Sequence, residues 1–189
     1  MTTANKITLF RVVLVPLFMA ALLIEYPGSD YVGLGIFILA GITDHIDGYV
    51  ARKYNQITTF GKFIDPLADK LLVTAALLIL VERGRMPSWC AMIIIAREFA
   101  VSGLRLIAAA KGVVIAAGAS GKVKTVVSIV AVCFMLTAHV HDFQLIPGVL
   151  SVDTLAIALI VSTTLWSGIE YFVRNHSLLE FQARSDDTD

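Results

Sequence analysis

Six apolar segments, each long enough to cross a lipid bilayer, dominate this 189-residue chain. Hydrophobic residues make up 57% of it, and its mean hydropathy is +0.80. A helix needs about 20 residues to cross the hydrocarbon core of a membrane. We therefore predict an all-α integral membrane protein with six transmembrane helices. The segments are Ile7–Ile24, Tyr31–Arg52, Asp65–Glu82, Pro87–Ala110, Lys122–His139 and Val152–Val173.

Charged residues occupy only one half of several of these segments. The second segment is uncharged until Asp44, whereas the third carries Asp65 and Asp69 at its start. When the segments are threaded in alternating directions, the charged halves all fall on one side of the membrane. The loops of the opposite side hold only Arg83 and Arg85 among the basic residues. The positive-inside rule then places both termini and a polar active-site cavity in the cytoplasm.

The length of the chain fits a single domain. We expect residues 1–175 to form one membrane domain and residues 176–189, which end in Arg-Ser-Asp-Asp-Thr-Asp, to form a polar C-terminal tail. Lys plus Arg and Asp plus Glu both total 15, so the net charge gives no reason to expect a nucleic-acid partner. The partners that we expect are membrane lipids.

Four aspartates stand at helical spacing beside the apolar runs, where ionisable side chains are costly and mark a functional site by default. Asp44 and Asp47 are three residues apart, and Asp65 and Asp69 are four apart, so each pair lies on one helix face. Carboxylates that converge repel one another unless a cation lies among them. Hard cations such as Mg²⁺ or Mn²⁺ prefer carboxylate oxygen. The four aspartates therefore predict a divalent-metal site.

Small residues and one arginine accompany the first aspartate pair. Gly48 and Ala51 leave space for a bulky ligand to touch the helix, and Arg52 can grip a phosphate with two parallel hydrogen bonds. A phosphate-bearing substrate is thus expected beside the metal.

The whole pattern is Asp44-x2-Asp47-Gly48-x2-Ala51-Arg52-x8-Gly61-x3-Asp65-x3-Asp69. It resembles, at every fixed position, the signature of the CDP-alcohol phosphotransferases, which are membrane enzymes with six transmembrane helices. Three further stretches resemble one branch of that family, the bacterial phosphatidylglycerophosphate synthases. They are Asn5-Lys6-Ile7-Thr8-Leu9-x-Arg11, Ala96-Arg97-Glu98-x3-Ser102-Gly103-Leu104-Arg105 and Gly121-Lys122-Val123-Lys124-Thr125.

The resemblance implies a reaction and a role for each matched residue. The donor would be CDP-diacylglycerol, the acceptor glycerol 3-phosphate, and the products phosphatidylglycerophosphate and CMP. Asp69 would be the general base for the acceptor hydroxyl and would also lie at the metal. The residues that would bind the CDP part of the donor are Asn5, Gly48, Ala51, Arg52 and Gly61. The resemblance also implies a homodimer in the bacterial cytoplasmic membrane.

Basic residues of the fourth and fifth segments are candidates for binding the phosphate of the acceptor. They are Arg97, Arg105, Lys122 and Lys124. Lys122 and Lys124 open a helix, and the exposed N–H groups of a helix N-terminus also favour an anion. Two alternatives remain open: the lysines serve only membrane topology, and Arg97 with its neighbour Glu98 mainly braces the helices.

Other functions remain possible from the residues alone. The same chemistry could act on inositol phosphate, serine or phosphatidylglycerol as acceptor. A divalent-cation transporter would use the same aspartates as a transport site, but it gives no reason for the small residues beside Arg52 or for the basic cluster.

Overall fold

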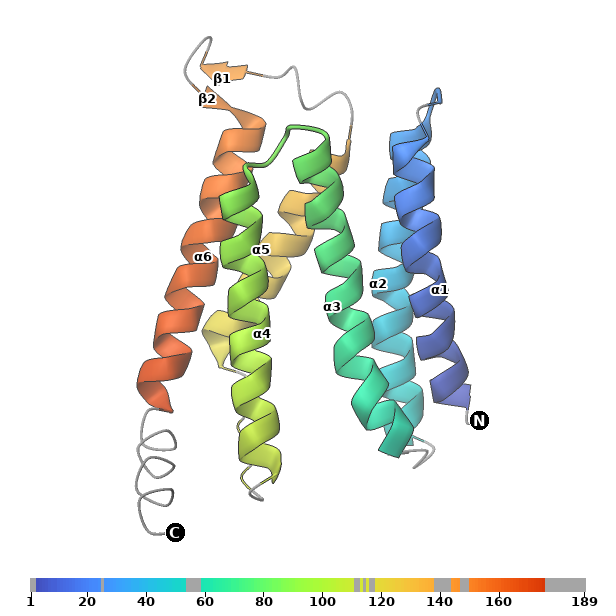
Figure 1. Ribbon diagram of the computed structural model, residues 1–189, viewed down its shortest axis with the longest axis vertical. Helices are drawn as coiled ribbons and strands as arrows, with labels where there is room; N and C mark the ends of the chain where they lie inside the picture. The colour runs from blue at the N-terminus through green and yellow to red at the C-terminus, as the bar shows by residue number, and fades with distance from the viewer. Residues whose placement is uncertain are drawn as a thin grey trace. The chain divides into compact units, whose positions relative to one another are not determined.

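The structure, a computed structural model, describes residues 3–24, 26–53, 59–110, 113, 115, 118–137, 144–146 and 150–175. Of these, residues 3–6, 44–53, 59–66, 69, 110, 144–146 and 150 are described by their backbone only. The helices are α1 (Thr3–Leu23), α2 (Ser29–Lys53), α3 (Thr59–Glu82), α4 (Ser88–Ala110), α5 (Ala119–Leu136) and α6 (Val152–Arg174), shown in Figure 1. In the described part of the chain, the prediction of a helical protein with six helices is confirmed.

A short antiparallel ribbon departs from the all-α prediction. Strands β1 (Gln144–Ile146) and β2 (Leu150–Ser151) pair between α5 and α6, with Gln144 opposite Ser151. This stretch lies between the fifth and sixth predicted segments, where a loop was expected. Strands of two or three residues are too short to show an alternating pattern in the sequence, so the ribbon was not predictable.

The chain divides into two compact units. The first unit comprises Met1–Pro87 and Val132–Asp153, and the second comprises Ser88–Ala131 and Thr154–Asp189. Each unit is described separately below.

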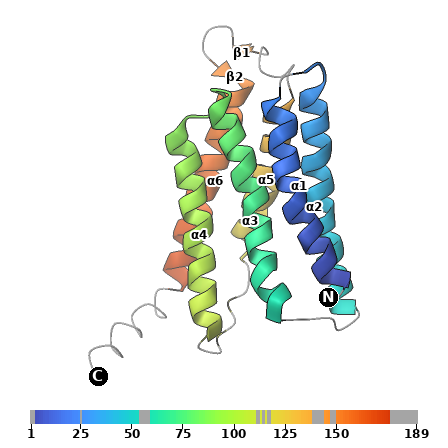
Figure 2. The same cartoon turned by 45° about the vertical axis from the view of Figure 1, so that its right-hand side comes forward.

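In the first unit, α1 packs against α2 and α3, and the three helices lie side by side in both views (Figures 1 and 2). The rings of Phe18 and Phe37 are 5.8 Å apart and both side chains are buried. One helical turn away, Gly33 of α2 lies directly against Leu22 of α1. These two contacts fix the register of the antiparallel α1–α2 pair.

Gly33 is expected to tolerate no larger side chain. A Cβ atom at this position would lie 2.5 Å from Cγ of Leu22, and Leu22 is itself only 1% exposed and has little room to move. We expect Gly33→Ala to lower the free energy of unfolding by about 1–3 kcal/mol, the usual cost of overpacking. Unfolding of the detergent-solubilised protein by SDS measures this. The matched control is Gly35→Ala on the same helix, where the added methyl group meets nothing within 4 Å. An equal loss in both variants would contradict the packing explanation.

At one end of the first unit, two arginines tie the helix ends together. Arg83 forms an ion pair with Asp30 at the start of α2 and donates to the Leu22 carbonyl oxygen, 2.7 Å away, at the end of α1. Arg85 forms a two-point ion pair with Asp153 at the start of α6, with N–O distances of 3.0 and 2.9 Å. The only basic residues expected in the outer loops are therefore both paired with carboxylates.

In the second unit, α4 and α6 lie side by side in both views (Figures 1 and 2). Val101 and Leu104 of α4 form a buried cluster with Tyr171 of α6. Ile115 and Phe172 pack against the edge of this cluster.

Many large apolar side chains of the described helices are exposed, and several polar or charged side chains are buried among the apolar core residues. Trp166 and Ile169 of α6 are 55% and 64% exposed, whereas the buried positions include Arg11, Lys124 and Thr164. By length and composition, α5 and α6 qualify as membrane spans among the described residues, and α1 and α2 contain shorter apolar stretches. A large exposed apolar surface with buried charges is what a lipid environment favours.

Candidate active site

The aspartate signature is carried by two consecutive helices of the first unit. Asp44 and Asp47 lie towards the end of α2, and Asp65 and Asp69 lie in the first half of α3. The connection between α2 and α3 is short, and a chain reaches at most about 3.6 Å per residue. The end of α2 and the start of α3 therefore lie within about 22 Å of each other, so the two pairs belong to the same end of the unit.

The side chains of all four aspartates lie outside the described residues. The same holds for the side chains of the predicted donor-binding residues, whose backbones belong to α1, α2 and α3: Asn5, Gly48, Ala51, Arg52 and Gly61. Among the described side chains, no three acidic, histidine or cysteine groups come together. The metal site and the donor site stay predictions. Their donor set, carboxylates on two neighbouring helices, suits a hard divalent cation.

Two polar residues of α1, Thr8 and Arg11, are buried. Extrapolating the antiparallel pairing of Phe18 with Phe37 and of Leu22 with Gly33 along both helices matches Arg11 with Asp44 and Thr8 with Asp47. Thr8 and Arg11 are 2% and 1% exposed. A guanidinium group so deeply buried is costly unless its charge is compensated, so Arg11 is a further charged residue to consider together with the aspartates.

Sequence reasoning did not assign Thr8 or Arg11 to the site. Both residues appeared only as part of the resembling N-terminal stretch. A signal was present, because they are three residues apart and interrupt an apolar run on a single helix face. Which residues of α2 they would face could not be read from sequence, since that depends on the register of the two helices.

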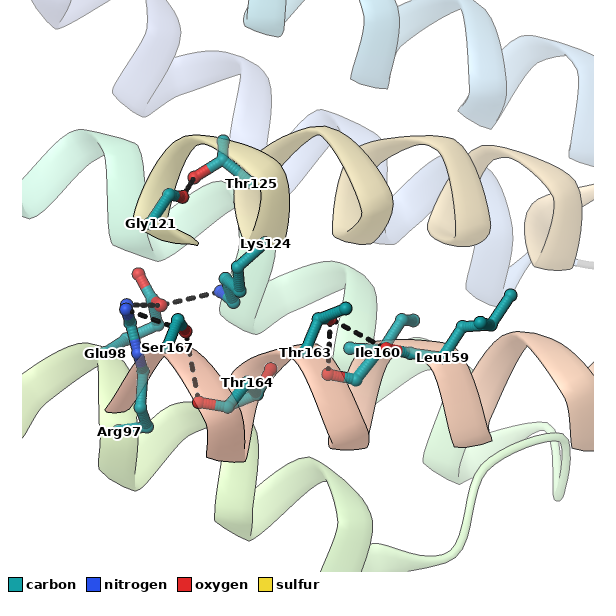
Figure 3. A network of polar contacts seen from close by, with 10 residues as sticks. All are labelled: Arg97, Glu98, Gly121, Lys124, Thr125, Leu159, Ile160, Thr163, Thr164 and Ser167. Carbon is teal, nitrogen blue, oxygen red and sulfur yellow. Dashed lines mark hydrogen bonds and ion pairs between the residues drawn. The ribbon is translucent and has the colours of Figure 1, made fainter. Parts of the chain in front are cut away.

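In the second unit, Glu98 connects two of the predicted phosphate-binding residues (Figure 3). Its Oε1 atom accepts hydrogen bonds from Lys124 Nζ at 2.6 Å and from Arg97 Nη1 at 2.9 Å. Arg97 Nη2 donates to Ser167 Oγ at 3.0 Å, and Ser167 Oγ donates to the carbonyl oxygen of Thr164 at 3.1 Å. This polar chain joins α4, α5 and α6.

Arg105, one of the other two candidates, lies two turns further along α4. Its guanidinium carbon is 5.4 Å from the centre of the Tyr171 ring, a distance that permits a cation–π interaction. The Nε atom of Arg105 and the hydroxyl group of Tyr171 are buried and have no hydrogen-bond partner within the described residues. Polar groups in this state are costly, so an additional partner at this place would stabilise the site.

Lys122 is exposed and lies in the first turn of α5. This helix begins at Ala119, three residues before the predicted start of the fifth segment at Lys122. The four predicted basic residues therefore differ in their surroundings. Lys124 and Arg97 share a carboxylate, Arg105 covers an aromatic ring, and Lys122 faces outwards.

The sequence is similar to known proteins over nearly its whole length. The family model of CDP-alcohol phosphatidyltransferases matches residues 1–166. A CDP-diacylglycerol–glycerol-3-phosphate 3-phosphatidyltransferase of Bacillus subtilis is 45% identical, over 93% of this chain and 96% of that protein. The Haemophilus influenzae protein of the same name is 39% identical, over 92% of this chain and 94% of its own length.

A solved structure supports the fold. The apo crystal structure of Mycobacterium tuberculosis phosphatidylinositol phosphate synthase matches with a TM-score of 0.63, covering 92% of this chain and 89% of that one. Its sequence identity is 17%, so the similarity shows a shared fold only. Together with the family match over residues 1–166 and the extended identity to curated relatives, these findings show that the chain belongs to the CDP-alcohol phosphatidyltransferase family.

Proposed function

We propose that the protein is a phosphatidylglycerophosphate synthase, which transfers the phosphatidyl group of CDP-diacylglycerol to sn-glycerol 3-phosphate and releases CMP. The observation that carries the proposal is the 45% identity to the Bacillus subtilis enzyme of that name across 96% of its length. The complete aspartate signature on α2 and α3 supports the same reaction class.

In the proposed reaction, the 1-hydroxyl oxygen of glycerol 3-phosphate attacks the β-phosphorus of the donor. The new phosphorus–oxygen bond replaces the anhydride bond to CMP, which leaves with the bond electrons. Asp69 accepts the hydroxyl proton as general base. Mg²⁺ or Mn²⁺ held by the aspartates would stabilise negative charge on the diphosphate and on the leaving CMP. The residues proposed to hold this metal are Asp44, Asp47, Asp65 and Asp69.

The remaining site residues position the two substrates. Gly48 and Ala51 leave space for the CDP part of the donor, Arg52 binds its phosphates, and Asn5 and Gly61 complete this site. Arg105, Lys122, Lys124 and Arg97 are proposed to bind the phosphate of the acceptor. The buried Arg105 Nε, which lacks a hydrogen-bond partner within the described residues, supports that assignment.

We further propose that residues 1–175 form one membrane domain with six spans, that both termini and the active-site cavity face the cytoplasm, and that residues 176–189 form a polar tail. The apolar exposed surface and the two membrane-capable helices support a multi-pass protein of the bacterial cytoplasmic membrane. We also propose that it assembles as a homodimer, because the sequence resembles this family.

CMP release by the purified protein in detergent tests the reaction. With CDP-diacylglycerol and Mg²⁺ or Mn²⁺ present, we expect release when glycerol 3-phosphate is added, and none when inositol phosphate, serine or phosphatidylglycerol replaces it. A chelator should abolish the release, and added metal should restore it. Release with a different acceptor would move the protein to another branch of the family. Metal flux into proteoliposomes without CMP release would favour a cation transporter instead.

A further inference from the structure

We propose that Glu98 is a positioning residue for the acceptor phosphate, holding the Lys124 ammonium and the Arg97 guanidinium at one fixed place. The inference rests on the proposed function, and it assigns a role to a carboxylate that the reaction itself does not require. An acidic side chain beside an anion site opposes binding by simple charge, so its presence needs a separate reason.

The first reason is that one oxygen atom serves both cations. Glu98 Oε1 accepts from Lys124 at 2.6 Å and from Arg97 at 2.9 Å (Figure 3). Because Lys124 belongs to α5 and Arg97 to α4, this shared acceptor sets the distance between their charged groups. Hydrogen bonds in which both partners are charged are short and strong, so they hold long side chains in one conformation.

The second argument for a positioning role is that the side chains of both cations are largely buried. The Lys124 side chain is 4% exposed, and that of Arg97 is 14% exposed. A buried cation that loses its counter-charge is strongly destabilised, so Glu98 helps to keep both groups in position when the site is empty. Glu98 itself is 25% exposed, which leaves its carboxylate in reach of an arriving ligand.

The third argument is that contacts with α6 also hold the Arg97 side chain in place. Arg97 donates to Ser167 at 3.0 Å, and its Cγ atom would lie 3.2 Å from a Cβ atom at Gly168. The absence of a side chain at Gly168 therefore lets Arg97 pass close to α6. Arg97, Lys124 and Glu98 together carry a formal charge of +1, which favours an anionic ligand.

The test compares Glu98→Gln, which removes the charge at nearly constant shape, with Glu98→Asp, which keeps the charge. Thr163→Val is the matched control, because among the described residues the Thr163 hydroxyl donates within α6, to Leu159 O at 2.7 Å and Ile160 O at 3.1 Å. The measurements are KM and kcat for glycerol 3-phosphate in CMP release, the KM for CDP-diacylglycerol, and the thermal midpoint of each protein.

We expect Glu98→Gln to raise the KM for glycerol 3-phosphate about tenfold, the size of one lost charge-assisted hydrogen bond. The kcat and the KM for the donor should stay within about twofold. Glu98→Asp should recover part of the acceptor affinity, and Thr163→Val should behave as the unchanged protein. A lower thermal midpoint with an unchanged KM would reduce Glu98 to a structural brace and overturn the proposal. A decrease in KM would overturn it too, since Glu98 would then compete with the phosphate.

Two further experiments keep the role of Glu98 testable, the first if Glu98→Gln does not fold and the second if the proposed function fails. If Glu98→Gln does not fold, a raised KM in Glu98→Asp at normal thermal stability supports the proposal, and an unchanged KM overturns it. If the unchanged protein uses no glycerol 3-phosphate, the proposed function fails. The affinity for inorganic phosphate, measured by calorimetry, then tests the role of Glu98. Weaker binding by Glu98→Gln than by the wild-type protein supports the positioning role, and equal binding overturns it.

Discussion

Replacing Asp69 by asparagine is expected to reduce turnover by about a thousandfold or more while CDP-diacylglycerol still binds. A positioned general base typically contributes about 10²–10⁴ in rate. Asparagine has nearly the shape of aspartate but cannot accept the hydroxyl proton. Steady-state CMP release measures turnover, and calorimetric titration with the donor in the presence of Mg²⁺ measures binding. Substantial residual turnover would contradict the role of Asp69 as general base.

Asp65→Asn provides the comparison, because Asp65 is assigned to the metal alone. That variant should lose donor binding along with turnover, since the diphosphate would lose the cation that holds it. If Asp69→Asn and Asp65→Asn weaken donor binding equally, Asp69 acts as another metal ligand and the base must be sought elsewhere.

Replacing Arg85 by methionine is expected to cost about 3–5 kcal/mol of unfolding free energy, the largest stability effect that we predict. The Arg85 and Asp153 side chains are 6% and 9% exposed and meet through two hydrogen bonds. The variant would leave the Asp153 carboxylate buried without the guanidinium that now neutralises it. Titration of the purified protein with SDS, followed by helical circular dichroism, gives the free energy.

The double variant Arg85→Met/Asp153→Leu tests whether the loss comes from the charge of Asp153. Replacing a whole buried ion pair by apolar side chains is often neutral, so the double variant should recover most of the stability. If it is no more stable than Arg85→Met alone, the cost arises from packing around Arg85 and not from Asp153.

The sequence predicted the helices well where apolar runs are long. The second, fourth and sixth segments agree with α2, α4 and α6 to within two residues at either end. The start of α3 was predicted wrongly: the helix begins at Thr59, and not at Asp65. Hydropathy marks the part of a helix that lies in lipid, so it does not show polar turns that extend beyond the apolar run.

The candidate site was only partly predictable, for a different reason. The aspartates and basic residues could be chosen because their charge is exceptional in an apolar chain. Their partners could not be chosen, because pairing depends on tertiary contacts. Glu98 meets Lys124 across 26 positions of sequence, and Arg97 meets Ser167 across 70. Nothing in local spacing indicates such pairs.

The ion pairs of Arg83 and Arg85 also bear on the order in which the chain assembles. During synthesis from the N-terminus, Asp30 emerges long before Arg83, so the α1–α2 hairpin remains without its counter-charge until α3 has been inserted. The Arg85–Asp153 ion pair forms later still, because Asp153 follows Arg85 by 68 residues and is synthesised after α4 and α5. The first unit therefore gains the Arg85–Asp153 ion pair only when the chain returns at the start of α6.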